Sequence, residues 1–149
     1  MALGYASILA DVNSLISVAA PAFTRVIRKE IVVVESDTLP LCLIVPDFQA
    51  DAAESFEGQI HLDYRVGIAL IFPGNQQLQT GLSNILDNRD KIRKNLHVTT
   101  LPTASVAGDP CGVFDCRLEM NPVYDISALD KNYDFTLMDF IYRSAELRN

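Results

Sequence analysis

The sequence has little of several features that would identify common protein classes. It contains no tryptophan, only three cysteines and two histidines, and fewer basic than acidic residues among its 149 positions. Three cysteines are an odd number at spacings that fit no disulfide framework, which indicates folding in a reducing cytoplasm. The net charge of −7 argues against general binding to nucleic-acid phosphates, because such binding needs lysine and arginine to displace counterions.

Long hydrophobic runs are also missing. No apolar stretch approaches the length of a membrane span, so we expect no membrane partner. Residues 1–23 lack an early positive charge and carry Asp11, so they are typical of an amphipathic helix and not of a signal peptide. Length and a hydrophobic content of 49% predict one globular domain over residues 1–149.

Motifs that carry known chemistry are absent as well. The sequence has no GxxxxGK[ST], GxGxxG, HExxH or GxSxG pattern. Cys111 and Cys116 could begin a metal site only with ligands taken from Cys42, His61 and His97, and their spacing is wider than structural zinc sites use. A Cys111–His97 nucleophile is disfavoured because Asp109 and Asp115 oppose a thiolate. We therefore expect no catalytic residue, no metal and no cofactor, and a binding or assembly module instead of an enzyme.

What the sequence does contain is a long alternating stretch, residues 59–72. Apolar side chains occupy every second position from Ile60 to Phe72, and polar ones fill the alternate positions of its first half: Gln59, His61, Asp63 and Arg65. This pattern predicts a strand with one face in a core and the early part of the other face in water. From Gly67 onward the second face is small or apolar too, so we expect cover on both faces there.

Two helices are predicted by apolar residues at helical spacing. They lie in residues 3–20 and 76–96, and the apolar stripe of the second is Leu78, Leu82, Ile85, Leu86, Ile92 and Leu96 with Arg89 inside it. Arg89 is either exposed or paired, and the sequence does not decide between the two.

Four further strands are predicted. Residues 25–36 and 39–45 could form a hairpin, and residues 46–58 and 98–112 are expected to be long loops. Near the C-terminus, two strands that begin at Val113 and Tyr133 are expected to pair antiparallel, the first with this apolar face: Phe114, Cys116, Leu118 and Met120. The order α-β-β-β-α-β-β predicts an α+β fold, a mostly antiparallel sheet with both helices on one face.

Asp139 stands at an apolar position of the last strand. It shares a face with Leu137 and Ile141, so its carboxylate must be paired or lie where the sheet meets solvent or a neighbouring subunit. An exposed strand end is the simpler interpretation.

Several segments of the sequence, and the order in which they follow one another, resemble the tail terminator or tail completion (neck) proteins of long-tailed bacteriophages. The segment 39–45, LPLCLIV, is similar to their first strand, and residues 61–72 are similar to their long strand. Residues 75–96 match their second helix, and 135–143, FTLMDFIYR, their closing strand. The resemblance covers nearly the whole chain.

The resemblance implies a structural virion protein, not an enzyme. Such proteins form a ring, usually a hexamer, that closes the tail tube and joins it to a head-side connector or stopper protein. The implied location is the head–tail junction of the virion after synthesis in the host cytoplasm, with DNA passing through the ring without specific binding. An acidic channel surface would suit that passage.

Subunit or partner contacts are expected in the two long loops and on the polar half of the long strand. The expected residues are Asp47, Phe48, Asp51, Glu54, Phe56, Glu57, His61, Asp63, Arg65, Thr103, Val106, Asp109 and Arg143. Other functions remain open beside the tail terminator: another neck or head-completion (stopper) protein, a tail-tube subunit, or a small cytoplasmic α+β binding domain. The strong helix at 76–96 counts against a tube subunit.

Overall fold

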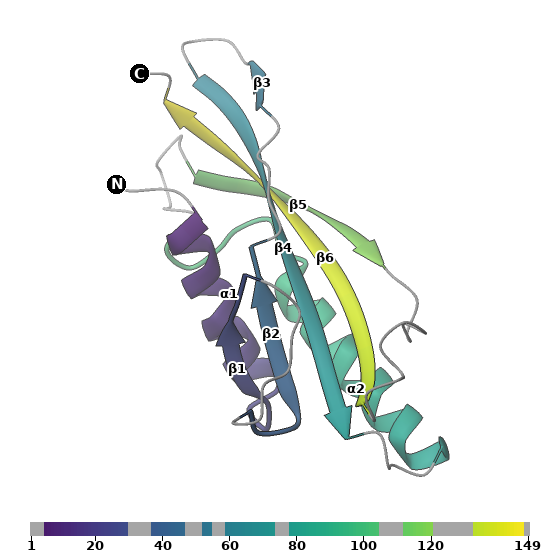
Figure 1. Ribbon diagram of the computed structural model, residues 1–149. Coiled ribbons are helices and arrows are strands. Elements are labelled where there is room, and N and C mark those ends of the chain that lie inside the picture. Colours follow the sequence, from purple (N-terminus) through teal and green to yellow (C-terminus); the bar gives the residue numbers. More distant parts are fainter. Residues whose placement is uncertain are drawn as a thin grey trace.

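The computed structural model describes residues 5–29, 37–46, 52–54, 59–73, 78–104, 112–120 and 133–147. Figure 1 shows the arrangement of its elements, which are α1 (Tyr5–Ala19), β1 (Thr24–Ile27), β2 (Leu41–Val45), β3 (Ala52–Glu54), β4 (Gln59–Pro73), α2 (Leu78–Leu96), β5 (Gly112–Met120) and β6 (Tyr133–Leu147). The predicted α+β class is confirmed, and so is the order α-β-β-β-α-β-β of the helices and the five main strands.

The long strand β4 lies at the centre of the sheet, as its pattern predicts. The strand order is β1-β2-β4-β6-β5, with the short β3 added beside β4. All 15 residues of β4 pair antiparallel with β6, from Gln59↔Leu147 to Pro73↔Tyr133. On its other edge β4 pairs with β2 over 67–71 and with β3 over 60–62. The predicted antiparallel pair at the C-terminus, β5 and β6, is confirmed.

Both helices cover one face of the sheet, which is the face of the even-numbered β4 side chains (Figure 1). Helical spacing places Ile8, Val12 and Ile16 of α1 fully inside the core. On α2 the buried stripe is Ile85, Arg89, Ile92 and Leu96. The expected core position of Leu86 is wrong: this side chain is 42% exposed, because the buried stripe follows the spacing from Ile85 and leaves Leu86 beside it.

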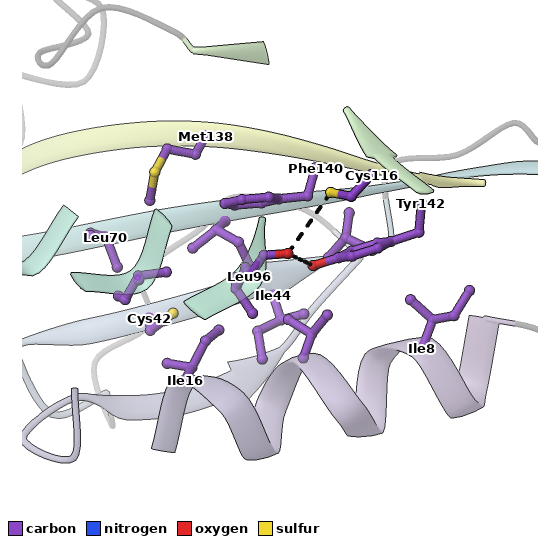
Figure 2. Close-up of a cluster of buried hydrophobic side chains, with 14 of the residues drawn as sticks. Ile8, Ile16, Cys42, Ile44, Leu70, Leu96, Cys116, Met138, Phe140 and Tyr142 are labelled. Atoms are coloured by element: carbon purple, nitrogen blue, oxygen red, sulfur yellow. Dashed lines mark hydrogen bonds between the residues drawn. The ribbon is translucent and has the colours of Figure 1, made fainter. Parts of the chain in front are cut away.

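The end of α2 is held by side chains from the sheet (Figure 2). The carbonyl oxygen of Leu96 accepts a hydrogen bond of 2.7 Å from the Tyr142 hydroxyl and a longer one of 3.8 Å from the Cys116 thiol. A carbonyl in the last turn of a helix has no partner within the helix, and here Val98 N also donates to it at 2.9 Å. The Leu96 carbonyl therefore joins the end of α2 to both β5 and β6. None of the described helices is long and apolar enough to cross a membrane.

The second half of β4 is buried on both faces, as predicted. Gly67, Ala69 and Ile71 are buried on the face opposite the helices. Ala69 and Ile71 belong to a second, smaller apolar cluster with Leu41, Leu43 and Val45 of β2. The expectation of cover beyond Gly67 is therefore confirmed.

Two predictions for the first half of the chain are wrong. β1 and β2 lie side by side but parallel, with Thr24 opposite Leu41, so they do not form a hairpin. A hairpin needs a tight turn, whereas β1 ends at Ile27 and leaves enough chain to return to the beginning of β2. Within the expected loop 46–58, Ala52–Glu54 is a strand, because the polar start of β4 offers it a free edge. Residues 30–36 of the predicted first strand lie outside the described residues.

A β-bulge also changes the predicted faces of β5. The register with β6 shifts between Val113 and Asp115, so Phe114 lies in the bulge. Val113 is then buried in the helix-side core together with Cys116, while Phe114 is 43% exposed. Strict alternation predicts the opposite faces for Val113 and Phe114, because it assumes one residue against one throughout the strand.

Candidate interaction surface

The sheet face away from the helices carries a set of paired charges at the half that β2 does not reach. We call this surface the charged face and define it by seven residues of three adjacent strands: Asp63 and Arg65 of β4, Asp139 and Arg143 of β6, and Asp115, Arg117 and Glu119 of β5. The pairing register brings them together, because Asp63, Arg143 and Asp115 lie directly opposite one another, and so do Asp139 and Glu119.

Asp63 is the most buried member of the charged face. Its Oδ1 accepts from Arg143 Nε at 2.8 Å, and its Oδ2 accepts from Arg143 Nη2 and from Arg117 Nη2, each at 3.1 Å. Only 11% of its side chain is exposed. The hydrogen bonds from Arg143 hold the pKa of the Asp63 carboxyl below its usual value, and the same contact raises the pKa of Arg143.

The expectation that the first half of β4 keeps its polar face in water is therefore wrong for Asp63, which is buried. The reason is tertiary: long arginine side chains from β5 and β6 lie over it and replace water as hydrogen-bond donors.

Arg65 connects the two outer strands of the charged face across β6. Its Nη1 lies 2.7 Å from Glu119 Oε2 and 3.8 Å from Asp139 Oδ2. This contact lowers the pKa of Glu119. Both side chains of the Arg65–Glu119 pair are partly exposed, so the pair contributes little to stability and serves mainly to order the surface.

Asp139 is accordingly paired, and the interpretation as an exposed strand end is wrong. It lies in the middle of β6 opposite Gly67, where a Cβ atom would come within 3.2 Å of its Oδ1. The small residue on β4 leaves room for the carboxylate.

Two rings lie at one end of the charged face. The centroids of His61 and Phe114 are 5.0 Å apart in a tilted arrangement. The bulge turns Phe114 toward His61, since an unbulged strand would direct it to the helix side. We call these two residues the aromatic pair. The charged face thus ends in an exposed apolar contact of a kind that interfaces favour.

Four of the residues expected at an interface come together here: His61, Asp63, Arg65 and Arg143. Thr103 lies elsewhere, in the helix layer, where its hydroxyl and its backbone N–H both donate to Asp11 of α1. Glu54 is described only as part of β3. The remaining expected residues lie outside the described part of the chain: Asp47, Phe48, Asp51, Phe56, Glu57, Val106 and Asp109.

Sequence reasoning missed Phe114 and the β5 charges Asp115, Arg117 and Glu119. Alternation along β5 was a usable signal for the three charges, because they share a face opposite Cys116 and Leu118. The alternation does not predict the strand order. In the structure β6 lies between β4 and β5, and their polar faces therefore form one surface.

In the described part of the chain, the cysteine and histidine side chains considered above for a metal or nucleophile site make structural contacts. Cys42 and Cys116 are buried, and burial raises the pKa of each thiol to about 12. His97 Nε2 lies 3.2 Å from the Cys116 carbonyl oxygen, whereas Cys111 is not among the described residues. Within the described ranges, no group of three or more His, Cys, Asp or Glu side chains could hold a metal ion.

The sequence does not decide whether Arg89 is exposed or paired. In the structure it is buried and donates to the Thr136 hydroxyl.

Comparison with family models and with curated proteins found no match to this chain. The fold and the charged face therefore carry the inference about function.

Proposed function

We propose that the chain is a structural virion protein that assembles into a ring, as a tail terminator or tail completion protein of a long-tailed bacteriophage. In this role about six copies close the end of the tail tube and meet the head-side connector or stopper protein. The ring lies at the head–tail junction, and DNA passes through it without specific binding.

The observation that carries the proposal is the length of the β4–β6 ladder. Fifteen paired residues extend over roughly 50 Å at about 3.3 Å per residue. A compact chain of this length has a radius of gyration of about 15 Å, hence a diameter of about 40 Å. In Figure 1 the ladder continues beyond the end of α1, where β3 joins it. Sheet that the helices do not cover is a surface on which a second subunit can pack.

The open edges of the sheet support assembly in a closed ring. Among the described residues no strand pairs with the outer edge of β1 or of β5. Edges of this kind invite uncontrolled pairing, and a head-to-tail ring removes the hazard because every subunit offers both edges to neighbours. The net charge of −7 fits a channel through which DNA slides without adhering.

The mass in solution tests the proposal most directly. We expect the purified chain to sediment as a species near six times 16.5 kDa and to show rings in negative stain. A monomer or dimer at tens of micromolar would contradict the proposal and favour a small binding domain. Genes for portal, connector and tail-tube proteins beside this one would support the phage assignment independently of the mass.

A further inference from the structure

Arg117 has hydrogen-bond donors that the fold does not use. Only its Nη2 contacts a carboxylate, Asp63 Oδ2 at 3.1 Å, and 59% of its side chain is exposed. Within the described part of the chain its Nε and Nη1 have no partner. Asp63 is already held by two bonds from Arg143, so the carboxylate is shared between two guanidinium groups. Nη2 has a second hydrogen, and together with the hydrogen of Nε or of Nη1 it can bind a further carboxylate with paired hydrogen bonds.

Arg117 lies close to a second unused feature. Phe114 is on the same strand and 43% exposed, and the His61 ring lies beside it on this face. Asp115, which is exposed, lies opposite Arg143 in the register and not opposite Arg117. A ligand that joins a carboxylate to an aromatic ring would therefore meet Arg117 and Phe114 together.

We propose that Arg117 and Phe114 receive the acidic segment 46–58 of a second copy of this chain. The segment has four carboxylates and no lysine or arginine. It places an aromatic residue next to a carboxylate twice, at Asp47-Phe48 and at Phe56-Glu57. This inference rests on the proposed self-assembly and assigns the two surfaces that meet.

Sheet order favours a second copy over the segment's own subunit. Part of the segment, β3, pairs with β4 on the edge away from β6. Arg117 lies on β5, three strand spacings from β3, which is about 14 Å. Asp47-Phe48 begins two residues after the end of β2 at Val45, and β2 also pairs with β4 on the edge away from β6. Donor and acceptor surfaces at opposite edges of one sheet produce a head-to-tail contact, which closes into a ring.

Mixing two charge-reversed variants tests the inference. We expect Arg117→Glu alone and the double variant Asp47→Lys with Glu57→Lys alone to raise the concentration for half-assembly about tenfold or more. An equimolar mixture should recover wild-type assembly. In alternating copies, the glutamate introduced at position 117 meets the introduced lysines, and the native Arg117 of the other variant meets native carboxylates. Lys91→Glu, an equal charge change on an exposed residue of α2, should leave assembly unchanged.

The other outcomes overturn either this inference or the ring proposal. Recovery only when all three substitutions are in one chain would place the contact within a subunit and overturn the inference. Wild-type assembly by Arg117→Glu would also overturn it and leave the ring proposal intact, whereas a monomeric wild type would overturn the ring proposal. Duplex DNA binding that Arg117→Glu abolishes would assign Arg117 to DNA instead. If Arg117→Glu loses its circular-dichroism spectrum, Phe114→Ser replaces it, because this side chain packs on the surface.

Discussion

At the residue scale, one carboxylate holds two arginines in place on the charged face. Asp63 receives three hydrogen bonds from Arg143 and Arg117 while only 11% of its side chain meets solvent. Its two arginines are more exposed, with 59% of the Arg117 side chain and 38% of the Arg143 side chain meeting solvent, so water can replace part of what they lose without Asp63. The geometry of the charged face therefore depends on Asp63 more than on the exposed pair Arg65–Glu119.

We predict that Asp63→Asn lowers the free energy of unfolding by roughly 1–3 kcal/mol at pH 7, because it weakens charge-assisted hydrogen bonds whose donors water can still reach. The folded-state pKa of Asp63 lies below its unfolded value of about 3.9, so its contribution is present above that pH and is lost as pH falls through the folded pKa. The gap between wild type and variant should therefore narrow below about pH 4. Urea unfolding at a series of pH values measures it.

Asp90→Asn is the matched control for this prediction. Asp90 also pairs with two cations, Arg93 and Lys94, but on α2 the three side chains are 33–68% exposed. Exposed pairs contribute little, so its effect should stay small at every pH. A gap for Asp63→Asn that does not change with pH would contradict the assignment of the acid-sensitive contribution to Asp63.

At the element scale, a single side chain of α1 positions the beginning of β5. Asp11 is 3% exposed and accepts from Thr103 N at 3.0 Å, Thr103 Oγ1 at 2.7 Å and Ala104 N at 2.8 Å. The carbonyl oxygen of Ala104 in turn accepts from Val113 N at 2.9 Å. The bulge that exposes Phe114 follows directly, so α1 and the charged face are connected through this segment.

We predict that Asp11→Ala lowers the free energy of unfolding by about 2–4 kcal/mol, because it leaves the buried Ala104 N–H without its acceptor. Asp11→Asn keeps one acceptor oxygen and should lose less. Urea denaturation measures both values, and amide exchange at Ala104 reports the local opening. Equal stability of Asp11→Ala and wild type would show that the segment 101–104 is held by other contacts.

At the scale of the whole molecule, two electrostatic effects oppose each other. A net charge of −7 makes copies repel, while the proposed contact of Arg117 with an acidic segment attracts them. Centres about 40 Å apart lie several Debye lengths from one another at 0.1 M salt, where that length is about 10 Å. General repulsion is thus largely screened already, and the contact pairs retain most of their strength.

We therefore predict that raising salt from about 0.1 M to about 0.5 M weakens assembly of the wild type. Arg117→Glu should show a smaller dependence on salt, because it lacks the attractive pair. Sedimentation velocity at matched concentrations measures both. Stronger assembly of the wild type at higher salt would show that repulsion between the acidic subunits dominates and would contradict a charge-based contact.

Local patterns were enough to predict the fold class and the helices and main strands, but not the short strand β3. The alternation from Ile60 to Phe72 identifies β4 because side-chain period is a property of the strand itself, and the spacing of Ile8, Val12 and Ile16 identifies α1 in the same way. The interface expectation included three members of the charged face, Asp63, Arg65 and Arg143, and also His61 at its end. Polar positions on a half-buried strand can be recognised from the sequence alone.

The arrangement of the elements was decided only by the tertiary structure. The parallel pairing of β1 with β2, the place of β6 between β4 and β5, and the bulge at Phe114 all depend on contacts between segments distant in sequence. The burial of Asp63 has the same origin, because its two arginines come from other strands. By itself the sequence determined the two helices, the five main strands and most of their polar faces. The tertiary structure decided which polar faces share one surface, because strand order and register depend on long-range packing and not on local period.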